Sequence, residues 1–331
     1  MANHHTSGTV RLLRVTAGGK DYMIDLAHIA AIDDSKPIAE RTWAGRSVVD
    51  IEFRGRTLPA AKLSKRLAPA TNTQFFSDAP ESKRSYLVVI GAGERSWAMM
   101  VDKVSAETTV PREWIKPLPA VCGNTRTTPL AGVLVTGTEH EDERPIERMT
   151  LVLDPTRLHP DVALLQEPPT AVRTVPINQK RPPSPPPGRF QMINVVASGR
   201  AIKDLETYIG LSFAQVLEII EPTDLLETPF APSFVKGLTL WRDQATAVID
   251  LARRLKLPPL HSETTRWAIA RATPGGDPIG FPIRPTVDVL RLPAPHRPSS
   301  FNCDPNLVLG AYQLEDRTLL VPDLAAAAYC R

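Results

Sequence analysis

Residues Pro229–Leu255 have the sequence PFAPSFVKGLTLWRDQATAVIDLARRL. The two prolines near its start fix φ and bias the residues before them toward extended backbone, and Gly237 permits a bend at low cost. Two β-prone runs follow, Leu238–Trp241 and Gln244–Ile249, and Arg242-Asp243 lies between them. We predict a strand, a tight turn that holds the Arg242 guanidinium at its rim, a second strand and the start of a short helix.

A second copy of this segment lies far upstream. Residues Val49–Leu67 have the sequence VDIEFRGRTLPAAKLSKRL and align with it without a gap, so that Arg54 falls on Arg242 and Leu67 on Leu255. The preceding segment repeats as well, because Ile24–Ile29 matches Leu211–Val216 with the alignment shifted by a single position. Two matched segments in the same order indicate a duplicated domain.

At these residues the chain resembles the CheW-type coupling domain of bacterial chemosensory systems. That family's pattern has two prolines, an aromatic residue, Val and Gly before an apolar strand, then an Arg-Gly turn and a Pro-Val-Val/Ile-Asp-Leu run. The positions of the second copy that fit this pattern are Pro229, Pro232, Phe234, Val235, Gly237, Arg242, Val248, Ile249, Asp250 and Leu251. Asp243 stands where the family has Gly, and Ala247 stands where it has Pro. The first copy keeps Arg54-Gly55 and Pro59 but has Val49 where Gly is usual.

The resemblance implies an all-β protein with two CheW-like domains, each a pair of small five-stranded SH3-like β-barrels with short helices. We expect the first domain at residues 1–166 and the second, more divergent in its second half, at residues 190–331. Residues 167–189 are rich in proline and favour polyproline II, so about 20 of them could span ~60 Å as a spacer. Their P-x-x-P pattern leaves a docking role as the alternative. Trp241 is predicted to be buried between the barrels, and Phe53 to belong to the core.

The composition is that of a soluble globular protein long enough for two hydrophobic cores, with 331 residues, 42% hydrophobic and 23% charged. The formal net charge of +3 is small and no basic run alternates with aromatic residues, so nucleic acid is not an expected partner. Three distant cysteines without zinc-binding spacing favour reduced thiols. No stretch approaches ~18 apolar residues. We therefore expect a cytoplasmic location without direct membrane insertion, with a place at membrane-associated receptor arrays left open.

Several short patterns suggest catalysis or metal binding, and each has a plainer explanation. Asp33-Asp34 resembles the acidic pair of a phosphoacceptor receiver domain, but the segments after it suggest hairpins rather than alternating strands and helices. Gly91-Ala92-Gly93 lacks the helix-opening glycine of a phosphate-binding loop, and the acidic run Glu139–Glu143 has no second set of metal ligands. We therefore predict that the protein is not an enzyme and binds neither a cofactor nor a metal.

The resemblance implies an adaptor that couples chemoreceptors to a CheA-type histidine kinase. Its expected partners are the regulatory domain of the kinase and the cytoplasmic tip of a chemoreceptor, the latter in a hydrophobic groove between barrels. The candidate partner-binding residues are Arg54, Gly55, Phe234, Gly237, Arg242 and Asp243. For the two arginines, a structural bond to a neighbouring carbonyl or carboxylate is an equal alternative. Two other functions stay open: a divergent interaction module that regulates another kinase or a motility system and, less favoured, an RNA-binding pair of barrels.

Overall fold

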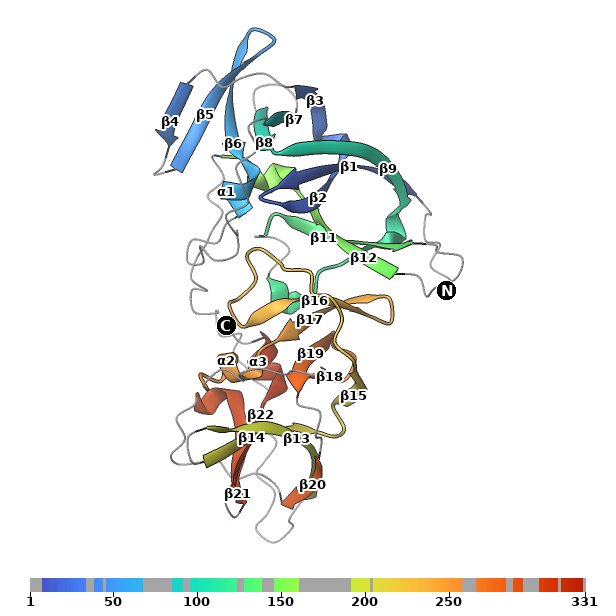
Figure 1. Cartoon of the computed structure of the whole chain (residues 1–331), viewed down its shortest axis with the longest axis vertical. Coiled ribbons are helices and arrows are strands. Elements are labelled where there is room, and N and C mark those ends of the chain that lie inside the picture. Colours follow the sequence, from blue (N-terminus) through green and yellow to red (C-terminus); the bar gives the residue numbers. More distant parts are fainter. Residues whose placement is uncertain are drawn as a thin grey trace, which may run out of the picture.

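The computed structural model describes residues 8–33, 39–43, 46–67, 85–91, 96–123, 128–138, 146–160, 192–202, 205–257, 266–283, 288–293, 304–314 and 317–329. In these ranges the chain forms four β-sheets and a few short helices, none of them long and apolar enough to cross a bilayer. Figure 1 shows two pairs of sheets stacked along the long axis, the N-terminal pair in blue and green and the C-terminal pair in yellow to red. The Pro-rich spacer lies outside the described residues, so the predicted domain boundaries stay predictions.

The first unit contains two six-stranded sheets. Sheet A has the strand order β10-β11-β12-β2-β1-β9, and sheet B has the order β3-β7-β8-β6-β5-β4. The strands of sheet A are β1 (Thr9–Ala17), β2 (Lys20–Asp25), β9 (Lys103–Pro111), β10 (Ile115–Lys116), β11 (Leu130–Thr138) and β12 (Ile146–Leu153). Those of sheet B are β3 (Ile29–Asp33), β4 (Ala39–Trp43), β5 (Arg46–Phe53), β6 (Arg56–Lys62), β7 (Tyr86–Ile90) and β8 (Trp97–Val101). The short helices are η1 (Leu26–His28), α1 (Leu63–Leu67), η3 (Arg112–Trp114), η4 (Ala120–Cys122) and η5 (Pro155–Leu158).

The second unit contains two five-stranded sheets. Sheet C has the order β20-β13-β14-β22-β21, and sheet D has the order β15-β18-β19-β17-β16. The strands of sheet C are β13 (Met192–Ile202), β14 (Leu205–Ser212), β20 (Asp288–Pro293), β21 (Val308–Leu314) and β22 (Arg317–Pro322). Those of sheet D are β15 (Val216–Ile220), β16 (Val235–Trp241), β17 (Gln244–Ile249), β18 (Arg266–Arg271) and β19 (Pro278–Ile283). The short helices are α2 (Leu251–Arg254), η6 (Pro305–Leu307) and α3 (Leu324–Tyr329).

The register of the strands confirms the duplication. In the β5–β6 hairpin Ile51 pairs with Leu58, and in the β16–β17 hairpin Thr239 pairs with Thr246, which are the positions that the sequence repeat aligns with them. Each unit also has two parallel pairs at equivalent places, β2–β12 and β6–β8 in the first and β14–β22 and β17–β19 in the second. The expected five strands per sheet describe the second unit. The first unit gains a sixth strand in each sheet, β10 in sheet A and β4 in sheet B.

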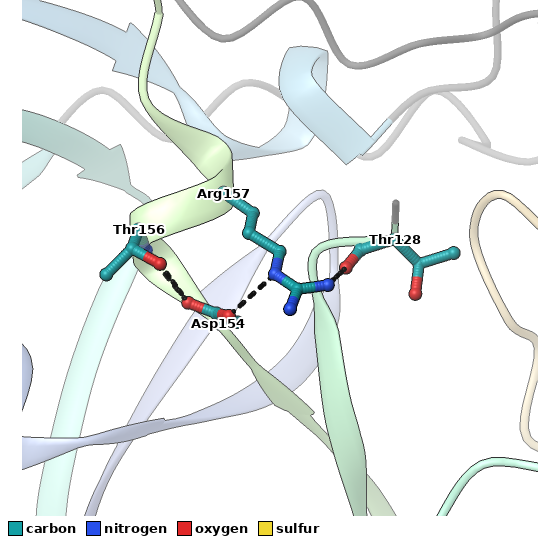
Figure 2. Close-up of polar contacts among 4 residues, drawn as sticks. All are labelled: Thr128, Asp154, Thr156 and Arg157. Atoms are coloured by element: carbon teal, nitrogen blue, oxygen red, sulfur yellow. Dashed lines mark hydrogen bonds and ion pairs between the residues drawn. The ribbon is translucent and has the colours of Figure 1, made fainter. Parts of the chain in front are cut away.

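The turn after β12 closes the first unit, and Figure 2 shows how its side chains fix it. Asp154 caps η5, because its Oδ1 accepts a hydrogen bond of 3.1 Å from the Thr156 amide and one of 2.5 Å from the Thr156 hydroxyl. Arg157 Nε pairs with Asp154 Oδ2 at 2.9 Å, and its Nη1 donates to the Thr128 carbonyl at 3.2 Å. Asp323, at the equivalent place in the second unit, caps α3.

The main hydrophobic core lies between the two sheets of each unit. In the first unit it includes Tyr22 of sheet A and Trp97 of sheet B, and smaller clusters on the other faces of the sheets include Ile51. The large cluster does not stop at the first unit. It continues into the second unit, where Leu238 and Phe281 belong to it. The two units therefore share a continuous apolar core as well as a topology.

Candidate functional site

The two turns that carry the candidate arginines have the same backbone conformation. Arg54 and Gly55 have φ of 50° and 71°, and Arg242 and Asp243 have φ of 48° and 60°. Positive φ at both central residues of a two-residue hairpin is the type I′ turn, whose twist matches that of the flanking strands. Asp tolerates the left-handed region better than most residues, so Asp243 can stand where the family has Gly. All four residues lie at the exposed surface.

Arg242 has a structural partner. Its Nη2 donates to Glu218 Oε2 at 3.0 Å, and its guanidinium lies 4.7 Å from the centre of the Trp241 ring. Trp241 Nε1 donates to the same Glu218 oxygen, also at 3.0 Å. Glu218 lies on β15 and Trp241 on β16, which are the two opposite edges of sheet D. These bonds therefore bring the edges together and close the sheet into a barrel. Trp241 is buried, with 7% of its surface exposed, and these contacts lie within sheet D, so its predicted place between the barrels stays a prediction.

Arg54 occupies the same turn in different surroundings. Its guanidinium lies 5.0 Å from the centre of the Phe53 ring, and Phe53 packs against the core cluster inside sheet B. The position equivalent to Glu218 is Ala31, which carries no carboxylate. The two arginines thus have equivalent positions in the fold but different neighbours.

Phe234 and Gly237 lie away from these turns. The centre of the Phe234 ring lies 4.6 Å from the guanidinium of Arg254. The backbone carbonyl of Phe234 accepts a hydrogen bond of 2.8 Å from the Asp250 amide. A Cβ on Gly237 would stand 2.8 Å from the Leu226 carbonyl oxygen. The structure therefore separates the six candidate residues into four at exposed turns and two at the start of edge strand β16, where Phe234 is partly buried and Gly237 is buried.

A further pair of arginines, Arg66 and Arg254, occupies equivalent positions of the sequence repeat. Arg66, with only 8% of its surface exposed, donates from Nε to the Leu158 carbonyl at 3.2 Å and from Nη2 to the His159 carbonyl at 2.8 Å. Arg254, its equivalent, donates from Nε to the Ala327 carbonyl at 2.9 Å. In each unit this arginine ties the helix after the hairpin to the C-terminal helical turn. The repeat is the signal that could have identified both.

Two buried ionisable side chains of the first unit lie beside residues of the second. Burial raises the pKa of the Cys122 thiol to about 12, and the side chain of Thr228 opposes that shift. Burial, and to a smaller extent the negative charge of Glu227, raises the pKa of Tyr22. In the part of the chain that the structure describes, no group of three or more His, Cys, Asp or Glu side chains could hold a metal ion.

The family model of the CheW-like domain matches residues 11–162 and again residues 204–329, which together are more than half of the chain. The chain belongs to the CheW-like domain family. The first matched range covers sheets A and B apart from the first residues of β1, and the second covers sheets C and D apart from β13. Among solved structures, the scaffolding protein TtCheW from Thermoanaerobacter tengcongensis is similar, with 20% identity, a TM-score of 0.35, and coverage of 41% of this chain and 92% of that one. The comparison with curated proteins found no match.

Proposed function

We propose that this protein is a non-catalytic adaptor of a chemosensory pathway. Its partners would be the regulatory domain of a CheA-type histidine kinase and the cytoplasmic tip of a chemoreceptor, on the cytoplasmic side of the membrane. Membership of the CheW-like family, found in both halves of the chain, supports this role. Arg54, Gly55, Arg242 and Asp243 remain the proposed partner contacts. Phe234 and Gly237 would act by holding the lead-in to β16 in place.

The observation that carries the proposal is a composite surface on sheet D. Leu217 and Ile219 of edge strand β15 are exposed, and Glu218 between them in the sequence binds Arg242. The edge strand that carries these exposed apolar side chains is thus tied to the cationic turn through Glu218, which suits a partner that presents apolar and acidic side chains together. In the first domain Ile32, at the position equivalent to Ile219, is also exposed.

The two copies of this surface are unlike, so we expect them to bind unequally. Arg242 is held by a carboxylate, whereas the position equivalent to Glu218 in the first domain is an alanine. A tandem adaptor with unequal copies can also bring two partners together, since the second contact forms at a raised effective concentration.

Titration calorimetry with the kinase regulatory domain and with a receptor-tip fragment tests this. We expect Arg54→Ala and Arg242→Ala to weaken different contacts, or one contact to very different degrees. A charged group truncated at a buried interface costs at least ~2 kcal/mol, or roughly 30-fold in Kd. Arg266→Ala is the matched control, because Arg266 is also an exposed, ion-paired arginine of sheet D, and its loss should leave both affinities unchanged.

Three outcomes would contradict the proposal in different ways. Equal losses for both variants against both partners would mean that the two copies are redundant. Undiminished binding by both variants would mean that neither arginine lies at an interface. If the unaltered protein binds neither partner, the chain is a divergent interaction module that serves another kinase or a motility system.

A further inference from the structure

The two CheW-like domains contact each other through unlike surfaces. The first domain contributes sheet A and η4, and the second contributes the loop of residues 221–234, which we call the lead-in loop, together with part of sheet D. Lys20 of β2 forms an ion pair with Glu227 of the lead-in loop, and the Ala120 amide donates to Asp277 Oδ2 at 3.4 Å. Figure 1 shows β16 and the chain that leads into it facing β11 and β12 of the first domain.

The two copies differ at the edge of the sheet from which this loop leads. In the first domain β4 pairs with β5 along its whole length and so covers the edge of sheet B. In the second domain the equivalent edge strand, β16, pairs with the lead-in loop only at an isolated bridge between Leu226 and Leu238. Elsewhere the loop is tied to sheet D at its two ends, where the hydroxyls of Thr223 and Thr239 lie 2.5 Å apart and the Phe234 carbonyl accepts from the Asp250 amide at 2.8 Å. Between these ends, Glu227 and Thr228 lie beside residues of the first domain.

Buried side chains of the first domain lie at this contact. Tyr22 and Cys122 each have 2% of their surface exposed, and their neighbours include Glu227 and Thr228 of the second domain. The apolar core cluster also runs through both domains. A cavity of about 860 Å³ remains beside the contact, with walls from both domains that include Arg148 of β12. The contact is thus part apolar and part solvated.

We propose that the second domain covers the sheet A face of the first domain. The two domains then behave as one rigid unit, and other proteins cannot bind this face. The exposed Lys20–Glu227 pair adds little affinity by itself. Its charges set the register of the docked loop, while the apolar contacts around Tyr22 and Cys122 hold it. Sheet C, which corresponds to sheet A, lies at the far end of the molecule and stays accessible (Figure 1). A protein that recognises the face shared by sheets A and C would therefore bind it only on sheet C of the second domain.

The test is made on the full chain, with a site-specific protease sequence inserted between residues 174 and 187. After cleavage we expect both fragments to elute together in size-exclusion chromatography at micromolar concentration. Lys20→Glu and Glu227→Lys should each weaken this association by roughly tenfold or more, since like charges would then face each other. The double exchange should restore it. Arg11→Glu is the matched control, because Arg11 lies on sheet A in an ion pair with Glu107 of the same domain.

A second measurement does not depend on cleavage. Alkylation of Cys122, quantified by peptide mass spectrometry, should be slow in the intact protein and about tenfold faster in Glu227→Lys, whereas the control should not change it. Separate elution of the cleaved, otherwise unaltered fragments would overturn the proposal. Fragment association that is unchanged by both charge reversals would also overturn it, because a different surface would then hold the fragments. Rapid alkylation of Cys122 in the intact protein would also contradict docking.

Discussion

Trp241 is the side chain on which closure of the second domain's barrel depends. Trp241→Ala removes an indole with 7% of its surface exposed, and truncations of large buried aromatics cost about 3–5 kcal/mol in unfolding free energy. Trp241→Phe keeps most of the ring but removes the N–H that binds Glu218 at 3.0 Å, which should cost about 1–2 kcal/mol. Arg242→Ala should cost less than about 1 kcal/mol, because the side chain of Arg242 is 69% exposed and that of Glu218 39%. Urea denaturation followed by circular dichroism gives all three values.

Trp114→Ala is the matched control for this series. Trp114 lies on η3 with 41% of its surface exposed, so its loss should cost clearly less than that of Trp241. Barrel closure by these side chains would be refuted if Trp241→Ala cost as little as this control. A loss above about 2 kcal/mol for Arg242→Ala would contradict the exposed setting of the ion pair and would make Arg242 a structural residue first.

Three further predictions concern other parts of the fold. Gly237→Ala should cost about 1–3 kcal/mol, because its Cβ would meet the Leu226 carbonyl at 2.8 Å, whereas Gly137→Ala, with nothing within 4 Å, should be nearly neutral in thermal denaturation. Arg66→Ala should cost about 2–3 kcal/mol in the same assay, since two backbone carbonyls lose a charged donor, and a neutral result would contradict its tying role. The free energy of unfolding should fall as pH rises above about 9, by up to ~1.4 kcal/mol per pH unit, because the pKa of the Cys122 thiol is near its ordinary value in the unfolded chain but about 12 in the folded one. Cys122→Ala should flatten this slope. An unchanged slope in the variant would contradict burial of the thiol.

The repeat within the sequence predicted much of the fold. The match of Arg54 to Arg242 aligned two hairpins, and the β5–β6 and β16–β17 registers confirm that alignment. The match of Ile29 to Val216 is confirmed by the irregularity that follows Ile29 in β3 and recurs after Val216 in β15. Local residue types also account for the hairpin at Gly18-Gly19, where φ is 58° and 74°. Such features depend on neighbouring residues, which a sequence shows directly.

The features that the sequence did not predict depend on distant residues. Strand β4 has no apolar alternation and exists because the edge of β5 pairs with it. Glu218 binds Trp241 only because sheet D curls until its edges meet, and curvature is not visible in a residue pattern. The ion pair between Lys20 and Glu227 joins positions far apart in the chain and depends on how whole domains pack. Tertiary geometry decided each of these.

An adaptor must hold two partners at once, so formation of a ternary complex tests the account most directly. The full chain, the regulatory domain of a CheA-type kinase and a chemoreceptor-tip fragment are mixed and analysed by size-exclusion chromatography with light scattering. We predict one peak whose mass accounts for all three proteins, with no joint elution of kinase domain and receptor fragment when the chain is omitted. Elution of the chain apart from both partners, or displacement of one partner by the other, would contradict the adaptor role.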